Sequence, residues 1–323
     1  MSISSESFEI DNINKEDDKD EKTEKLGNVI TKEETSITCS DNFFSYNLFP
    51  SLDNISDITS SKENLLLIFN EKNLTKTLQK SLINKSKQTI NDIVDNLSGS
   101  YRIIIRNNNG NYFLSDLLKI CDKFQRIKIL KELSSTISED CCNEFATHPI
   151  QKLIELASNS EEFNLILFSF NDYNKIIMPS LNKYGNYVIQ KIIINIPEIY
   201  RKNFDNLLVK FVLVLSKDAY GVSVLKRFIK YTKNGIIKNE FFNIITSNFL
   251  NISTNKYGNY IIQFLLEECW NEKEGKCIKK IILSKFKILM KNNFSSYICN
   301  LYYKLCDNEE KNLIMSQFNN NII

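Results

Sequence analysis

Amide and tyrosine side chains at a fixed spacing are the residues of this sequence best suited to specific binding. In the segment NKYGNYVIQ, residues 182–190, they are Asn186, Tyr187 and Gln190. A second segment, NKYGNYIIQ at 255–263, is identical to the first at eight of nine positions. Positions i and i+4 of a helix lie one above the other, with i+1 beside them. Each segment therefore predicts a helix that presents two amides and an aromatic ring on one face.

These groups suit the recognition of unpaired bases. A side-chain amide carries a donor and an acceptor, so it can match the acceptor–donor–acceptor edge of uracil. A tyrosine ring can stack between successive bases. For a single segment a simpler interpretation is favoured, in which Asn caps the helix, Tyr packs in the core and Gln is solvated. Repetition of the pattern reverses that preference and indicates binding of single-stranded RNA.

The pattern recurs seven times, because weaker copies lie between and beyond the two strong ones. We call the residue after the Gly-like position of each copy its anchor, and we number the repeats 1 to 7 by their anchors. The anchors are Thr75, Asn111, Thr147, Asn186, Val222, Asn259 and Ser296, at spacings of 36, 36, 39, 36, 37 and 37 residues. This period predicts a solenoid of stacked units. Gly, Ala or Ser before the anchor would allow close backbone approach between successive helices.

The composition favours helices for these units. The 323 residues are 42% hydrophobic and contain only four Pro and eight Gly, too few for a turn-rich β protein. Apolar positions after each Tyr/Phe-Gly break recur at helical spacing. The sequence therefore predicts an all-α protein.

Charge divides the chain into two parts. Residues 1–60 carry 14 acidic and 5 basic side chains, a net charge of −9, which leaves +11 for residues 61–323. We expect a disordered acidic tail over residues 1–45, a cap or degenerate half-repeat over 46–61, and the repeat domain over 62–323. A basic repeat domain suits a negatively charged partner, although charge alone favours an ordinary solvated surface.

Several classes of site are not expected. The cysteines, none in a C-x-x-C pair, are Cys39, Cys121, Cys141, Cys142, Cys269, Cys277, Cys299 and Cys306. We expect them to be reduced thiols of the core. His148 is the one histidine, so no metal cluster or histidine pair is expected. The N-terminus lacks a signal peptide and no apolar run has the length of a membrane span. We therefore expect a cytoplasmic, monomeric, non-enzymatic protein without cofactor or metal.

The Y-G-N-Y-[VI]-I-Q segments, their period and the weaker variants F-S-S-Y, F-A-T-H and G-N-Y-F resemble the repeats of Pumilio/PUF proteins. The resemblance covers residues 62–323. It implies a right-handed α-solenoid, a crescent of about seven three-helix repeats of ~36 residues, whose concave face binds RNA with one base per repeat. It also implies binding to mRNA 3′ untranslated regions, and translational repression or mRNA decay through deadenylation or repression factors.

Position by position, the resemblance implies two roles for the side chains of each repeat. The implied base-edge residues are Thr75 and Gln79, Asn111 and Ser115, Thr147 and Gln151, Asn186 and Gln190, Val222 and Lys226, Asn259 and Gln263, and Ser296 and Asn300. The implied stacking residues are Lys76, Tyr112, His148, Tyr187, Ser223, Tyr260 and Tyr297. For His148, the residue before Pro149, an ordinary place at the start of a helix is equally well supported.

Some repeats depart from the family pattern. Ser223 cannot stack, Val222 is apolar and Lys226 only donates, so repeat 5 is expected to discriminate little between bases. Asn300 replaces a Glu that would accept from guanine, and Ser115 replaces a Gln. The expected target is a U-rich element of the type GUNUAUA, with repeat 7 at its 5′ end. The eighth repeat usual in the family is expected to be lost or hidden in residues 40–61.

Two other interpretations of the solenoid stay open. One is a protein-binding α-solenoid scaffold, for which no column of base-binding residues is expected. The other is a divergent PUF-like nucleolar factor in ribosome assembly, a class that usually has more, and more divergent, repeats. Nothing in the sequence supports an enzyme.

Overall fold

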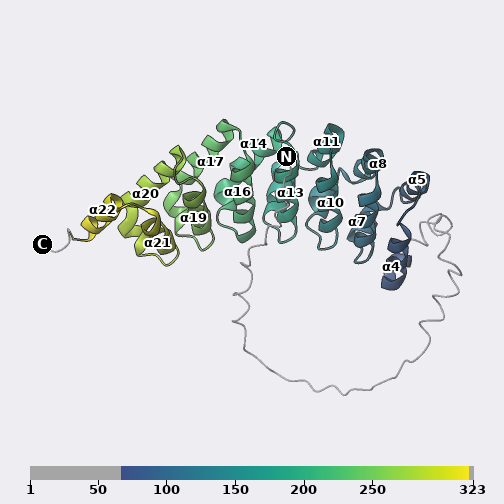
Figure 1. Ribbon diagram of the computed structural model, residues 1–323, viewed down its shortest axis with the longest axis horizontal. Coiled ribbons are helices and arrows are strands. Elements are labelled where there is room, and N and C mark those ends of the chain that lie inside the picture. The colour runs from purple at the N-terminus through teal and green to yellow at the C-terminus, as the bar shows by residue number, and fades with distance from the viewer. Residues whose placement is uncertain (1–66, 320–323) are drawn as a thin grey trace, which may run out of the picture. The chain divides into compact units, whose positions relative to one another are not determined.

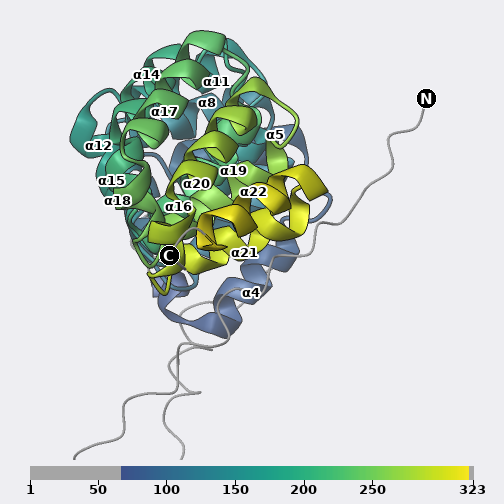
Figure 2. The ribbon, with the colours of Figure 1, turned by 90° about the vertical axis from the view of Figure 1, so that its left-hand side faces the viewer.

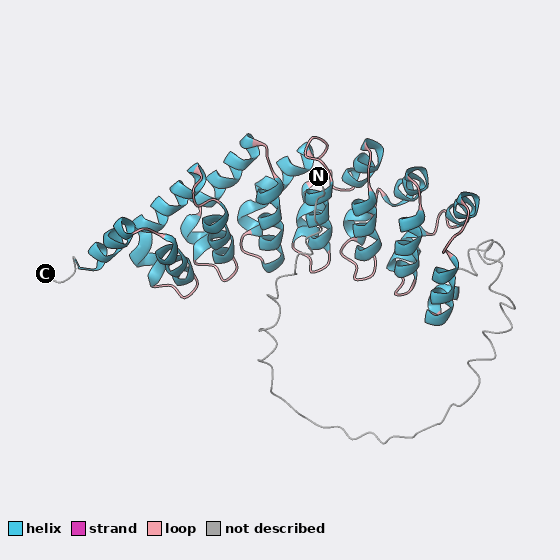
Figure 3. Ribbon diagram, in the orientation of Figure 1, coloured by secondary structure: helices cyan, strands magenta, loops and turns pink. Residues whose placement is uncertain are grey.

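The computed structural model describes residues 67–319, which lie within one compact unit, Ser51–Ile323. Every regular element in this part of the chain is a helix (Figure 3). The expected acidic tail, the expected N-terminal cap and the stretch 40–61 lie outside the described residues. Within the unit, helices succeed one another in a single row of repeats (Figure 1), which confirms the predicted all-helical solenoid.

One helix in each repeat carries the anchor, and these anchor helices stand side by side along one edge of the row (Figure 1). They are α4 (Lys72–Ser81), α7 (Gly110–Ile120), α10 (Thr147–Leu156), α13 (Gly185–Asn195), α16 (Ala219–Tyr231), α19 (Gly258–Glu268) and α21 (Ser295–Leu305). Each anchor helix packs on the anchor helices of the adjacent repeats, so equivalent positions of all seven repeats line up.

A second helix in each repeat forms the opposite edge of the row. These outer helices are α5 (Lys87–Asn96), α8 (Lys123–Leu133), α11 (Ser160–Phe168), α14 (Lys202–Leu208), α17 (Gly235–Ser247), α20 (Lys273–Met290) and α22 (Asn308–Asn319). Short third helices follow in repeats 1 to 5, the fourth of them preceded by the 3-10 turn η1 (Val209–Phe211). They are α6 (Tyr101–Arg106), α9 (Ile137–Asp140), α12 (Tyr173–Ser180), α15 (Val212–Leu215) and α18 (Phe249–Ser253).

Figure 2 looks along the row and shows the short helices α12, α15 and α18 gathered on one side of the repeats. Repeat 6 differs, because α20 continues for 18 residues without a break. Its residues 276–290 contain no Gly, Pro, Asn or Asp, the residues that most readily end or interrupt a helix. The predicted three-helix unit is therefore found in repeats 1 to 5, but the second and third helices are fused in repeat 6.

An Asn or Asp four residues before the anchor starts each anchor helix from α7 onward. Asn182 Oδ1 accepts hydrogen bonds from the backbone N–H groups of Tyr184 and Gly185, at 2.8 and 3.0 Å. Asn107, Asn143, Asp218, Asn255 and Asn292 make the same pair of bonds in their repeats. These bonds satisfy N–H groups that a helix start leaves unpaired. The simpler interpretation of the sequence made the anchor the helix cap. In the structure, the residue four positions before the anchor has that role.

The glycine before the anchor is required by close packing, as the sequence predicted. A Cβ atom at Gly258 would lie 2.2 Å from the carbonyl oxygen of Ile252, at the end of the preceding short helix. At Gly221 the corresponding distance, to the oxygen of Leu215, is 2.4 Å. Only a residue without a side chain fits these contacts unchanged. In the four repeats that have this glycine, the contacts fix where the anchor helix leaves the preceding short helix.

The core follows the apolar positions between the anchor and the residue four after it. Val188, Ile189, Ile261 and Ile262 are fully buried, as predicted. Most described cysteines are also buried free thiols, but Cys277 is exposed on α20, so the expectation that all are core residues is wrong there. Packing between neighbouring anchor helices therefore holds the face that carries the candidate site.

Candidate nucleic-acid interface

The three predicted site positions lie at three different depths on the anchor helices. All seven residues after the anchor are exposed: Lys76, Tyr112, His148, Tyr187, Ser223, Tyr260 and Tyr297. The residues four after the anchor are half-buried in six repeats and exposed at Asn300. The anchors themselves are buried in six repeats, and only Ser296 is half-buried. The expectation that both amides point outward is therefore wrong for the anchor.

The buried anchor is engaged within its own helix. Asn186 Nδ2 donates to the carbonyl oxygens of Asn182 and Lys183, at 2.9 and 3.0 Å. Its Oδ1 accepts from Gln190 Nε2 at 2.9 Å. The donors of the Asn amide are thus used by the protein. The Gln amide lies nearer the surface and keeps one N–H and its carbonyl oxygen for a ligand.

Repeat 6 has the same arrangement at its amide pair. Asn259 Nδ2 donates to the backbone oxygens of Asn255 and Lys256, and its Oδ1 accepts from Gln263 Nε2 at 2.7 Å. In repeat 3 a threonine takes the place of the asparagine, and Gln151 Nε2 donates to Thr147 Oγ1 at 3.0 Å. In all three repeats, the anchor orients the amide of the residue four positions later.

The aromatic residues after the anchor lie on the surface rather than in the core. The exposed fractions of Tyr112, Tyr187, Tyr260 and Tyr297 are between 48% and 61%. Rings exposed to this degree, at equivalent positions of neighbouring helices, form a column on which flat groups can stack. His148 occupies the equivalent place in α10 and is also exposed, so it is both a helix-start residue and a member of the column.

Two repeats at the start of the row depart from this arrangement. Gln79 Nε2 of repeat 1 donates to Asp116 Oδ2 of repeat 2 at 2.7 Å, and Lys119 Nζ donates to Asp116 Oδ1 at 2.7 Å. In repeat 2, the Ser115 hydroxyl donates to the main-chain oxygen of Asn111 at 2.8 Å. Each departure changes which groups are available beside the exposed column.

Repeats 5 and 7 also depart. Val222 is a buried apolar anchor, and the Lys226 ammonium lies 5.6 Å from the ring centre of Phe264, on the next anchor helix. The Ser296 hydroxyl donates to the backbone oxygen of Asn293 at 2.8 Å, within its own helix start. Neither repeat contains the paired side chains of repeats 4 and 6.

The two strongest repeats also match a family model. The model described as "Pumilio-family RNA binding repeat" matches residues 180–203 and 248–279. Pumilio homolog 12 of Arabidopsis thaliana is 23% identical over 187 residues, which are 57% of this chain and 30% of the relative. Pumilio homolog 11 of the same plant is 27% identical over 130 residues, which are 38% of this chain and 22% of the relative. The chain thus spans less than a third of either relative.

Solved structures share the arrangement of helices. The Puf4 RNA-binding domain bound to an HO endonuclease 3′ UTR recognition sequence aligns with a TM-score of 0.72 at 20% identity, over 78% of each chain. The RNA-binding domain of yeast Puf5p bound to AAT2 RNA aligns with a TM-score of 0.70 at 18% identity, over 82% of this chain and 79% of that one. Residues 180–203 and 248–279 thus match the Pumilio-type RNA-binding repeat, and the described part of the chain shares the fold of these domains.

Charged side chains lie next to the residues four after the anchors. Four of the residues five after the anchor are basic: Lys80, Lys152, Lys191 and Arg227. Lys152 and Lys191, from adjacent repeats, both form ion pairs with Glu155. Partial burial raises the pKa of Glu155, but the hydrogen bonds from the two lysines outweigh this and lower it overall. The carboxylate thus stays charged beside cations that phosphates could also bind.

Three kinds of residue on this face of the repeats were not predicted from the sequence. They are the helix-starting Asn or Asp, the acidic Asp116 that holds Gln79, and Glu155 between two lysines. The first left a signal, since Asn or Asp recurs four residues before six anchors. Asp116 has no acidic counterpart in the other repeats, and Glu155 is matched only by Glu267 of repeat 6. Their roles were found only from their contacts.

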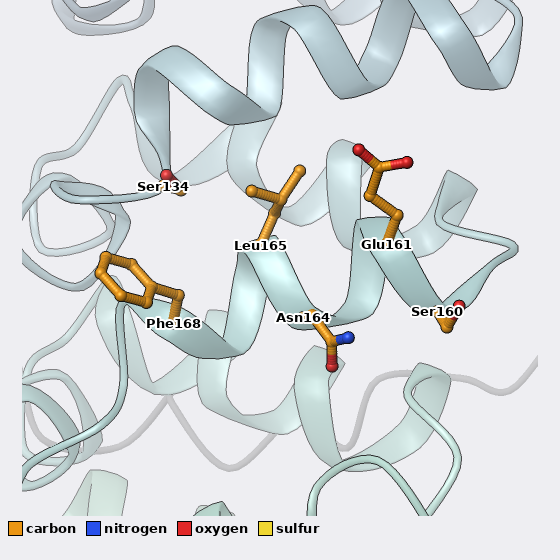
Figure 4. A pocket seen from close by; sticks show the side chains of 6 residues that line it. All are labelled: Ser134, Ser160, Glu161, Asn164, Leu165 and Phe168. Atoms are coloured by element: carbon orange, nitrogen blue, oxygen red, sulfur yellow. The ribbon is translucent and has the colours of Figure 1, made fainter.

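Other surfaces of the described residues are weaker candidates for a functional site. A hollow of about 550 Å³ lies between α11 and Ser134, the residue after α8, and Figure 4 shows Leu165 and Phe168 among its lining side chains. Its carboxylate, Glu161, forms an ion pair with Lys131 at 3.2 Å. Between residues 67 and 319, no group of three His, Cys, Asp or Glu side chains could hold a metal ion. No helix in that range is long and apolar enough to cross a membrane. The column on the anchor helices is therefore the best-defined candidate site.

Proposed function

We propose that the Pumilio repeats of this chain, residues 62–323, bind single-stranded RNA sequence-specifically, with one base per repeat. The observation that carries the proposal is the column of exposed residues after the anchors, beside half-buried side chains whose amides are held in place. Bases stacked on this column would bring their Watson–Crick edges against those amides. A protein-binding scaffold gives no reason for such alignment.

The amide geometry supports uracil at repeats 4 and 6. Because Asn186 accepts only one N–H from Gln190, the other N–H and the oxygen of the Gln190 amide are left for a ligand. These can donate to a uracil carbonyl and accept from uracil N3–H at the same time. Gln263 is held in the same way. The Thr and Gln residues of repeats 1 and 3 favour adenine, by resemblance to the family.

We further propose that the chain acts on 3′ untranslated regions of mRNA, in translational repression or mRNA decay, as a cytoplasmic monomer. Support comes from the Puf4 domain, whose structure contains an HO endonuclease RNA 3′ UTR recognition sequence, and from the Puf5p domain, whose structure contains AAT2 RNA. Deadenylation or repression factors would then be its protein partners. The preferred element would be of the type GUNUAUA.

The deciding experiment is selection of bound sequences from a random single-stranded RNA pool by the purified chain. We expect an enriched element with uracils two positions apart, at repeats 6 and 4. Competition should show that duplex RNA binds more weakly, because stacking requires unpaired bases. Affinity should fall as salt rises, because phosphate contacts release counterions. Absence of enrichment, or equal affinity for duplex RNA, would contradict the proposal.

A further inference from the structure

Repeat 2 contains a buried acceptor that no donor satisfies. Asn111 is fully buried, and among the described residues none hydrogen-bonds to its side-chain oxygen Oδ1. Its Nδ2 group is satisfied, since it donates to the backbone oxygens of Asn107 and Asn108 at 2.9 Å each. The unpaired atom lies on the anchor of α7, at the place where the proposed function puts the base edge of repeat 2.

The cause is the residue four positions later. In repeats 4 and 6, Gln190 and Gln263 donate to the corresponding oxygen of Asn186 and Asn259. Ser115 takes that place in repeat 2, and its hydroxyl donates to the main-chain oxygen of Asn111 instead. Serine is also shorter than glutamine by the whole amide group. Repeat 2 therefore has an unused acceptor and more room above it than repeats 4 and 6.

We infer that repeat 2 selects a purine, whereas the sequence alone predicts uracil there. This inference rests on the proposed RNA-binding function. The Asn111 oxygen needs a donor, and a purine edge extends farther from its sugar than a pyrimidine edge, so it fills the space left by serine. Adenine brings its N6 amino group and guanine its N1–H and N2 amino groups. These groups reach the acceptor directly or through the Ser115 hydroxyl, which can donate to Asn111 Oδ1 and accept from the base.

Uracil fits this site poorly for two reasons. It is a pyrimidine and stops short of the anchor. If it moved closer to Asn111, a carbonyl oxygen beside its one edge donor, N3–H, would also approach the unpaired oxygen of Asn111. In repeats 4 and 6, the free N–H of the glutamine amide removes that conflict. Where Gln is replaced by Ser, the repeat thus lacks the amide donor and has an unpaired acceptor instead.

The test exchanges the residue four after the anchor between repeat 2 and repeat 4. Four RNAs of the form 5′-GUAUAXA-3′, with X as each base, place X at repeat 2. Wild-type protein should bind the RNAs with adenine or guanine at X about tenfold more tightly than that with uracil. Ser115→Gln should restore the preference for uracil at X. The reciprocal Gln190→Ser should shift preference at the fourth base from uracil to purine and leave the preference at X unchanged.

Thermal unfolding without RNA provides an independent measurement. Ser115→Gln should raise the melting temperature, because its amide pairs with Asn111 Oδ1, and Gln190→Ser should lower it by leaving Asn186 Oδ1 unpaired. A wild-type preference for uracil at X, or melting temperatures unchanged in both variants, would overturn the inference while RNA binding stood. Failure of all four RNAs to bind would instead contradict the proposed function.

Discussion

Gln190 donates a hydrogen bond from Nε2 to Oδ1 of Asn186 across one turn of α13, over 2.9 Å. Because Asn186 also donates twice to the backbone that precedes the helix, its own orientation is fixed. The partner amide is therefore oriented before any ligand arrives. Such preorganisation lowers the entropy that binding must overcome.

Exchange of this pair should change base preference at one position. In the double variant Asn186→Ser, Gln190→Glu, a carboxylate replaces the amide, accepts from the two adjacent N–H groups of guanine and repels the oxygens of uracil. Preference at the fourth base should move from uracil to guanine by about 1–3 kcal/mol, the scale of one good bidentate base contact. Binding to RNAs that differ only at that base measures the change. Equal weakening toward all of these RNAs would show that the pair serves the fold rather than recognition.

The exposed ring of Tyr187 should contribute to RNA binding and little to stability. Tyr187→Ala should weaken binding of single-stranded RNA by about 1–3 kcal/mol, the scale of one base–ring stacking contact. The melting temperature should change little, since half of this side chain is exposed. Ser223→Tyr is the matched control that should strengthen binding. It adds a ring to the one repeat that has neither a ring nor a cation at this position. Tighter binding by that variant is expected, and weaker binding would argue against a continuous stack.

The Asn182 side chain should stabilise the start of α13. Asn182→Ala removes its bonds to the N–H groups of Tyr184 and Gly185 and should lower the free energy of unfolding by about 1 kcal/mol. Asn182→Asp is the control, because Asp218 makes the same bonds in repeat 5 at 2.9 and 2.8 Å. Denaturant unfolding should show a lower free energy of unfolding for Asn182→Ala than for Asn182→Asp. An equal decrease in both variants would contradict the capping role.

Asp205 should make stability depend on pH. Burial raises the pKa of this carboxyl from 3.8 to about 7, although its ion pair with Arg201 lowers it in part. The pKa of Asp205 is higher in the folded protein than in the unfolded chain, so protonated Asp205 favours the folded state. This stabilisation is complete at pH values below the pKa of the unfolded chain. It is lost as pH rises through about 7. Asp205→Asn cannot ionise, so its stability relative to wild type should increase from pH 5 to pH 8. A constant difference across that range would contradict the shifted pKa.

The sequence alone predicted much of this molecule because its information is local and repeated. A period of 36 to 39 residues, few helix breakers and apolar pairs such as Val188 and Ile189 predicted stacked helical units, which the structure confirms. The glycine before the anchor predicted the tight junction found at Gly258. Each of these conclusions needs only neighbouring residues and a constant register.

Tertiary structure alone decided what each site position can offer a ligand. The anchor and the next residue are about 100° apart around a helix, and the repeat pattern does not say which of them a neighbouring repeat covers. Stacking of the anchor helices buries Asn186 and leaves Tyr187 exposed. The contact of Gln79 with Asp116 joins residues 37 positions apart, and the unpaired oxygen of Asn111 depends on where the Ser115 hydroxyl turns. Burial and pairing of this kind arise from contacts between repeats and from side-chain orientation, which a periodic sequence pattern does not contain.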